Sequence, residues 1–237
     1  MKKLLQSPWL TALLFVLAAG LLLTGAIGGI RAALTRESAA YLASIGTQDI
    51  GVTLLENGEA VGWRDADGSG GWNERRGALL SGMLAENESV QPGKAYPESL
   101  CVKNSGKIES FVRVSLYCYW QDASGNKMQA LSPEFIQLAL LTGEGWVIDE
   151  QASTAERTVL YYTRALAAGE TTPPCCESLT IDPAVRSTLA SDGTSYNGMS
   201  FRVEAEVEAV QSHNAAAAIR SAWGRNVTVS GSVLTLN

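Results

Sequence analysis

The chain contains a single histidine, His213, within the segment FRVEAEVEAVQSHNAAAAIRSAWG (201–224). With Ser212 beside it and Glu208 nearby, this histidine could act as the base of a Ser-His-acid triad and take a proton from a serine hydroxyl. A triad depends on spatial arrangement, however, and the sequence has neither the G-x-S-x-G nor the H-E-x-x-H motif. We therefore interpret His213 as a residue of a polar turn. The sequence predicts no catalytic residue, no enzymatic activity and no cofactor.

Asp65 and Asp67 begin the segment DADGSGG (65–71), in which oxygen-bearing side chains alternate before a glycine. Calcium loops begin in this way, because Ca²⁺ requires several oxygen ligands on a sharply turned backbone. The twelfth position of the pattern is Arg76, where an EF-hand loop needs a glutamate. A polar surface turn is the simpler interpretation, and we predict no metal site. Calcium binding by the two aspartates stays open.

Three glutamates, Glu204, Glu206 and Glu208, alternate with apolar residues and would share one face of a strand. Paired carboxylates can act as general acid and base in glycoside hydrolysis. Acidic side chains on the outer face or edge of a sheet also keep it soluble. We assign these three residues no catalytic role.

Four cysteines, Cys101, Cys118, Cys175 and Cys176, follow the N-terminal apolar segment. An even number of cysteines in an exported chain favours disulfides over free thiols. Three pairings are possible, and a bond between the two neighbours would be strained, so distant partners are favoured. Zinc is the alternative, but no C-x-x-C spacing is present and the chain has only one histidine.

The N-terminus predicts export. Lys2 and Lys3 precede an uncharged apolar run over residues 9–30, which ends at Arg31. This pattern is typical of a secretory signal, here placed at residues 1–32. The alternative is an uncleaved membrane anchor, because 22 apolar residues are long enough to span a bilayer.

Removal of residues 1–32 leaves 15 basic and 24 acidic side chains, a net charge of −9. An acidic surface repels nucleic acid and anionic lipid. Nucleic acid is therefore excluded as an expected partner, and contact with a membrane is expected only through residues 9–30 of an uncleaved chain.

Period-two patterning dominates the rest of the chain. IESFVRVSLYCYW (108–120) places apolar residues on one face and a mixture on the other, and residues 201–209 alternate apolar with charged side chains. Turn dipeptides such as Asn57-Gly58 separate further strands, at 49–56, 98–103, 157–163, 177–182 and 227–236. The sequence therefore predicts an all-β fold, an antiparallel β-sandwich.

Helices are expected only as minor insertions. Residues 132–141 could form one, with Ser132 as N-cap and Pro133 at the first helical position. Residues 62–89 are rich in glycine and charge and are expected to form an irregular surface loop. We predict that residues 33–237 form a single domain.

A second helix is expected over residues 214–224. Asn214 would cap its N-terminus and Gly224 its C-terminus. Ile219 and Trp223 lie four residues apart, so both side chains can pack on the sheet.

Several segments together resemble the TasA/camelysin-type group of exported Firmicutes proteins, whose signals are removed by a SipW-type signal peptidase. They are QDIGVTLLENG (48–58), PGKAYPESLCVKNSGKIESFVRVSLYCYW (92–120), YYTRALAAGETT (161–172) and AVQSHNAAAAIRSAWG (209–224). Within the second, VKNSGKIESFVRV resembles a strand pair of that group. The resemblance extends from the signal to Trp223.

The resemblance implies a jelly-roll-like β-sandwich at the cell surface of a Gram-positive bacterium, in the extracellular matrix of a biofilm, often as a fibre subunit. Some relatives carry a metalloendopeptidase label, but this chain has no zinc-peptidase ligand set. The four cysteines and residues 62–89 depart from the group's pattern.

The sequence thus leads us to expect a secreted or cell-surface structural protein that polymerises by strand exchange. Residues 49–56, or the stretch before them at 33–48, would pair with the next subunit. Expected partners are further copies of the chain, other matrix or surface proteins, and the signal peptidase. A secreted metallopeptidase-like enzyme and a membrane-tethered binding module are the two alternatives.

Overall fold

The computed structural model describes residues 49–237 with the exception of 81 and 85–87. They belong to one compact unit, Thr47–Asn237. The predicted signal or anchor at 1–32 and the predicted domain start at residue 33 lie outside the described residues. Every helix in the described part is too short, or not apolar enough, to cross a membrane.

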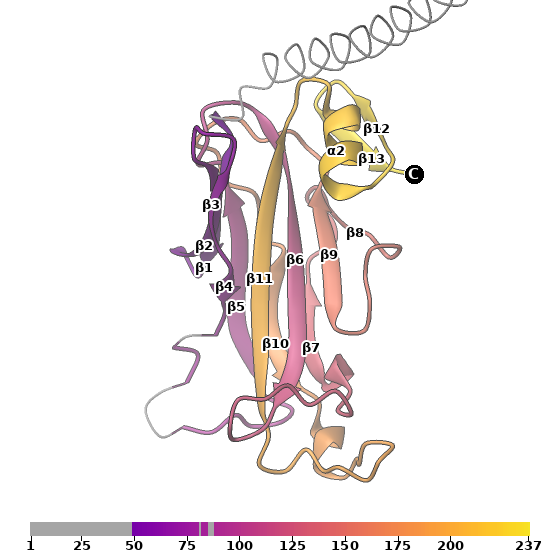
Figure 1. Ribbon diagram of the computed structural model, residues 1–237. Coiled ribbons are helices and arrows are strands. Elements are labelled where there is room, and N and C mark those ends of the chain that lie inside the picture. Colours follow the sequence, from indigo (N-terminus) through magenta and orange to yellow (C-terminus); the bar gives the residue numbers. More distant parts are fainter. Residues whose placement is uncertain (1–48, 81, 85–87) are drawn as a thin grey trace, which may run out of the picture. The chain divides into compact units, whose positions relative to one another are not determined.

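Two antiparallel sheets form the body of the protein (Figure 1). The first has the order β3 (Trp72–Arg75), β2 (Glu59–Ala66), β1 (Gly51–Glu56), β5 (Ala95–Lys103), β10 (Cys176–Ile181) and β7 (Ile136–Leu140). The second has the order β4 (Gly77–Ala78), β11 (Ser200–Gln211), β6 (Ser110–Gln121), β9 (Arg157–Tyr162) and β8 (Trp146–Ile148). The all-β, antiparallel prediction is confirmed.

The main core lies between these sheets. The first sheet contributes fully buried residues such as Val52, Leu54 and Leu100, and the second contributes Val112 and Val114. Burying an aliphatic side chain of this size stabilises the fold by about 1.5–3 kcal/mol. A shared apolar core of this kind holds the two layers of a sandwich together.

The long strands β6 and β11 pair over their whole length, from Ser110↔Gln211 to Gln121↔Ser200. In β11, Val203, Ala205 and Val207 point into the core, as the alternation predicts. These two strands extend through the whole body of the molecule (Figure 1).

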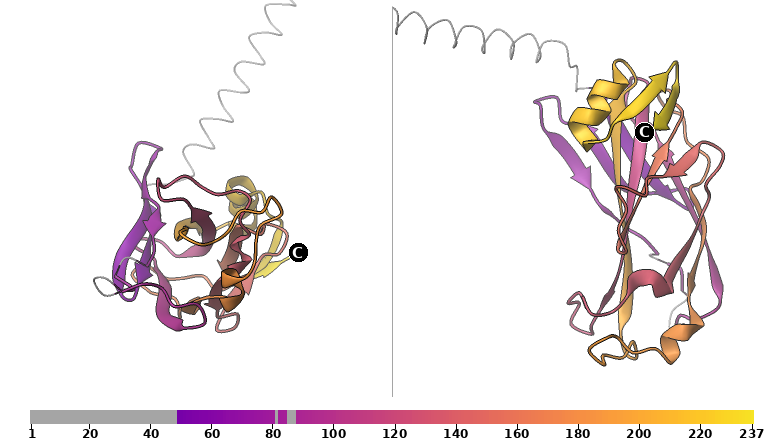
Figure 2. Two further views of the ribbon diagram at one scale, coloured as in Figure 1. Left: turned by 90° about the horizontal axis from the view of Figure 1, so that it is seen from below. Right: turned by 90° about the vertical axis from the view of Figure 1, so that its right-hand side faces the viewer.

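A second, smaller core lies on the outer face of the second sheet. It is covered by α2 (Ala215–Trp223) and the hairpin of β12 (Val227–Ser230) and β13 (Val233–Leu236), which gather at one end of the molecule (Figure 2). Ile219 is fully buried against Phe111 and Tyr161, and the Trp223 ring meets Tyr161 edge to face at 5.4 Å. The predicted packing of this helix is confirmed.

Four local expectations differ from the structure. The strand predicted at 227–236 is a hairpin, because its backbone reverses at Gly231, which has a positive φ. Asn214 precedes α2 in a left-handed conformation without a side-chain cap hydrogen bond, although Gly224 ends the helix as expected. The expected loop at 62–89 instead contains the end of β2, with β3 and β4.

The fourth difference is the helix predicted at 132–141, which is wrong. Ser132 does act as an N-cap, but only of one 3₁₀ turn, Pro133–Phe135. The chain then continues as β7, which pairs with β10; Ile136 is buried there and the other apolar residues of the strand are half-buried. A second 3₁₀ turn, Pro183–Arg186, follows β10.

Candidate functional site

The candidate site is a groove beside β11, where β4 ends. β11 pairs with β6 along its whole length, whereas β4 covers only two of its residues on the other side. One more bond, 3.0 Å from the Leu79 N–H to the Val203 carbonyl, continues this contact. Alternate residues of a strand point their backbone groups to the same side, so the N–H and C=O of Phe201 point to the side of β11 on which Val203 bonds to Leu79. No described strand pairs with Ser200–Arg202 on this side.

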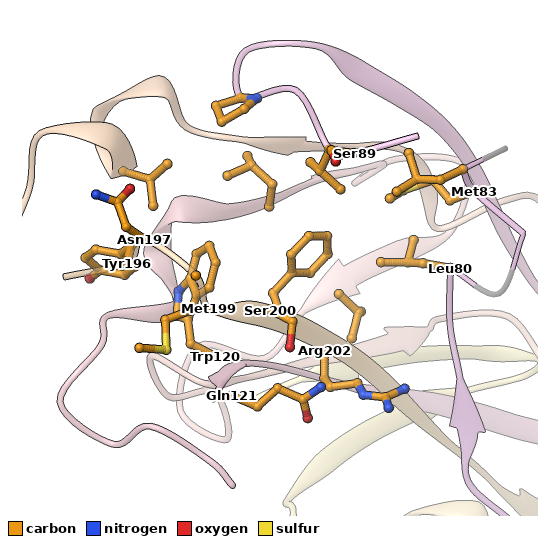
Figure 3. A pocket seen from close by; sticks show the side chains of 18 of the residues that line it. Leu80, Met83, Ser89, Trp120, Gln121, Tyr196, Asn197, Met199, Ser200 and Arg202 are labelled. Carbon is orange, nitrogen blue, oxygen red and sulfur yellow. The ribbon is translucent and has the colours of Figure 1, made fainter. Parts of the chain in front are cut away.

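The groove has a volume of about 1040 Å³ (Figure 3). Most of its lining residues are apolar, but polar and apolar atoms contribute about equally to its exposed surface. The apolar lining residues are Ala78, Leu79, Leu80, Met83, Leu84, Val90, Pro92, Trp120, Ile181, Val185, Tyr196, Met199, Phe201 and Val203. Among the described lining residues only Arg186 and Arg202 carry a charge. A large apolar pocket with a few polar groups is the usual form of a binding site.

Hydrogen-bonded aromatic residues form the floor of the groove. Trp120 and Tyr196 meet edge to face at 5.1 Å, and Phe201 lies 6.0 Å from Trp120. The Trp120 Nε1–H donates to the Ser132 carbonyl at 2.9 Å, and the Tyr196 hydroxyl accepts from the Ser132 N–H at 2.9 Å. The floor is therefore fixed before any partner binds.

Leu80 forms part of the groove wall and is tied to the interior of the first sheet. Its N–H donates to the Glu56 carboxylate. Glu56 and Glu98 are both buried, with exposed fractions of 6% and 2%. Burial, followed by the charge of Glu56, raises the pKa of Glu98 to about 7.

The glutamates of β11 share one face, as expected, but they are bound by arginines. Both oxygens of Glu208 are used: Arg64 Nη1 lies at 2.6 Å and Arg113 Nε at 2.5 Å. Arg64 belongs to the first sheet and Arg113 to the second. The three residues are largely buried, so this network joins the two sheets along one side of the sandwich.

Glu204 and Glu206 continue the network along the same face. Arg76 binds both carboxylates, and the Tyr117 and Tyr119 hydroxyls donate to Glu206 and Glu204 at 2.9 and 3.0 Å. Burial and the neighbouring carboxylate raise the pKa of Tyr117. The three glutamates therefore take part in one ion-pair network along this face of the sheet.

All four cysteines are free thiols in the structure, so it gives no support to the predicted disulfides, which stay a prediction for the exported protein. Cys118 contacts the main core, where Cys175 and Cys176 are buried, whereas Cys101 lies near the Ser99 hydroxyl at 4.0 Å. Burial raises the pKa of Cys118 to about 12 and that of Cys176 to about 11.

His213 is exposed in the turn between β11 and α2. Glu208 binds two arginines and is not available as the acid of a triad. The structure therefore does not bring His213, Ser212 and Glu208 together as such a site.

The two aspartates of the calcium-like segment have different partners. Asp67 Oδ1 accepts the N–H groups of Ser69 and Gly71 at 2.8 and 2.9 Å, and these bonds lower the pKa of its carboxyl. Asp65 Oδ1 accepts the Ser105 hydroxyl at 2.9 Å. The segment forms a side-chain-stabilised turn between β2 and β3.

Sequence reasoning missed both the groove and the buried carboxyl pair. The pair had a usable signal in the alternation of the strands. Glu56 lies on the same strand face as Val52 and Leu54, and Glu98 lies on the same face as Leu100 in another strand. Alternation places both glutamates on buried faces. The groove had no comparable signal, because its walls come from five separate segments.

No known protein family, curated protein or solved structure matches this chain in the three comparisons made. The resemblance to the TasA/camelysin-type group therefore stays a prediction.

Proposed function

We propose that this chain is an exported structural protein of the cell surface or extracellular matrix, which assembles by adding an extended segment of one copy to the β11 groove of the next. The observation that carries the proposal is the unpaired edge of β11 at Ser200–Arg202 beside a groove lined mostly by apolar residues. An added strand would bond to the backbone of Phe201, and its side chains would enter the groove.

The donor segment is residues 33–48 rather than 49–56. β1 pairs with β2 on one side and β5 on the other, and Val52 and Leu54 are fully buried. Removing it would expose the core, so it is not free to pair elsewhere. Residues 33–48 contain apolar side chains suited to the groove, including Tyr41, Leu42 and Ile45.

Further support comes from the sequence. The segment at 1–32 has the pattern of a secretory signal, whose removal would leave residues 33–48 at the N-terminus. A head-to-tail contact of this kind gives open fibres rather than closed rings. The TasA/camelysin-type resemblance implies the same architecture, a jelly-roll-like sandwich in a biofilm matrix.

A deletion and a matched pair of substitutions test the proposal. Deletion of residues 33–48 should abolish fibres seen by electron microscopy. Met83→Lys places a charge in the groove and should do the same, whereas Val233→Lys, at an apolar residue 51% exposed on β13, should leave fibres intact. Undiminished fibres from both the deletion and Met83→Lys would refute the proposal.

The two alternatives have their own tests. A secreted metallopeptidase-like enzyme would cleave casein in a chelator-sensitive way. A membrane-tethered binding module would keep Met1 in the protein isolated from cells, as mass spectrometry of the N-terminus would show.

A further inference from the structure

Two glutamates face the interior of the sandwich on neighbouring strands. Glu56 ends β1 and pairs in register with Leu100 of β5, and Glu98 lies two residues away from Leu100 on the same face. Their exposed fractions are only 6% and 2%. Carboxyl groups are rarely buried to this degree without a cationic partner.

The hydrogen bonds of the pair are incomplete. Glu56 accepts the Leu80 N–H, and the Asn57 side-chain amide lies 3.5 Å from Glu98 Oε2. The other oxygen, Glu98 Oε1, is buried without a hydrogen-bond partner. A proton on this carboxyl would supply the missing bond, because it can be donated to Glu56.

The groups that act on Glu98 give no charge compensation. In the described residues they are Glu56 of β1 and the neutral amide of Asn57. From β10, the Cys176 thiol faces the same carboxyl, and burial raises its own pKa to about 11. Two ionised carboxylates at this place would repel each other in a medium of low dielectric constant, so Glu98 keeps its proton to a higher pH than an exposed glutamate does.

Leu80 connects this pair to the groove. Its backbone has a φ of 68°, in the left-handed region that leucine rarely adopts. Two hydrogen bonds connect this segment to other strands. The Leu80 N–H donates to Glu56 of β1, and the Leu79 N–H donates to the Val203 carbonyl of β11. Loss of the first bond would release a strained residue that lines the groove.

We propose that Glu56 and Glu98 form a proton-operated latch on the β11 groove. With Glu98 protonated and donating to Glu56, Glu56 keeps Leu80 in the groove wall. When that proton is lost, the two charges separate, the bond to Leu80 breaks and the wall moves away from Phe201. The proton goes to solvent, the hydrogen bond that it made to Glu56 is lost with it, and no covalent bond other than the O–H bond of Glu98 breaks. The effect on assembly rests on the proposed function, whereas the movement of Leu80 does not.

The movement is measured on the purified full-length chain labelled with ¹⁵N-leucine. The Leu80 amide protection from hydrogen exchange, corrected for intrinsic base catalysis, should fall about tenfold between about pH 6 and pH 8, as the deprotonated fraction of a group with a pKa near 7 rises. Glu98→Gln should abolish this fall, because the amide cannot ionise. Glu177→Gln, at an exposed glutamate of β10, should preserve it.

A Leu80 protection that stays constant from pH 6 to pH 8 in the unmodified chain would overturn the latch, as would an unchanged fall in Glu98→Gln. Direct ¹³C titration of the glutamate carboxyls in the unmodified chain gives a test that needs no variant: a Glu98 carboxyl already ionised at pH 5.5 also refutes it. Sedimentation of the assembled form at both pH values reports on assembly separately. A moving Leu80 without any fibre formation would leave the latch standing and remove the proposed function.

Discussion

The buried position of Glu98 predicts a specific pH dependence of stability, which Glu98→Gln should remove. The Glu98 carboxyl is 2% exposed, and burial together with the charge of Glu56 raises its pKa from 4.5 to about 7. The folded protein therefore binds this proton more tightly than the unfolded chain does. Stabilisation by the proton is complete below about pH 4.5 and is lost as the pH rises through about 7.

The size of the effect follows from the two pKa values. At about 1.4 kcal/mol per pH unit, a rise from 4.5 to about 7 corresponds to about 3 kcal/mol of unfolding free energy. Other carboxyls titrate over the same range, so the relevant quantity is the difference between the unmodified chain and the variant. Glutamine keeps the shape of the side chain and can still donate to Glu56.

Urea denaturation from pH 4.5 to pH 8.5 measures this difference. The unfolding free energy of Glu98→Gln relative to that of the unmodified chain should rise by about 3 kcal/mol across this range, and the change should level off above about pH 7. Glu177→Gln, an exposed control, should follow the unmodified chain. Parallel pH profiles for the unmodified chain and Glu98→Gln would refute the reasoning.

Three further predictions concern packing and ion pairs. Ile219→Ala should cost about 2–5 kcal/mol in thermal or urea unfolding, because the side chain is fully buried under α2; a cost below about 1 kcal/mol would contradict this packing. Gly145→Ala should destabilise far more than Gly125→Ala, since an added Cβ would lie 2.6 Å from the Tyr162 ring at the first and in open space at the second, while both have positive φ; equal melting temperatures would contradict the difference. Glu208→Gln should lower the unfolding free energy by about 1–3 kcal/mol by weakening two partly buried ion pairs, and no loss in urea unfolding would show that the network contributes nothing to stability.

The strands with regular alternation could be predicted from the sequence. In β6 and β11 one face is apolar throughout, because one face lies on the core, and the period is unambiguous. β3 could not be predicted in this way: all four of its residues are exposed at the sheet edge, so no face has to be apolar. The sequence of β7 fits a helix as well as a strand, because a short apolar run is compatible with both. Only its pairing with β10 decides for the strand.

The candidate site depends on long-range contacts, which a local pattern does not contain. The groove exists because β4 ends after Ala78 and leaves part of β11 without a neighbour. Arg64 meets Glu208 across 144 residues of sequence. One part of the site could be seen in the sequence: Glu56 and Glu98 are charged residues at positions of two strands that the alternation places in the core.

Photo-crosslinking tests the central claim most directly, that residues 33–48 of one copy occupy the β11 groove of another. A photoreactive phenylalanine analogue would replace Tyr41 in full-length chains, and ¹⁵N-labelled and unlabelled chains would be mixed, assembled and irradiated. We expect mass spectrometry to find crosslinks between labelled and unlabelled chains that join position 41 to groove-lining residues, which are 78–80, 83, 84 and 196–203. Crosslinks that lie within single chains only, or that join position 41 to other surfaces, would contradict the account.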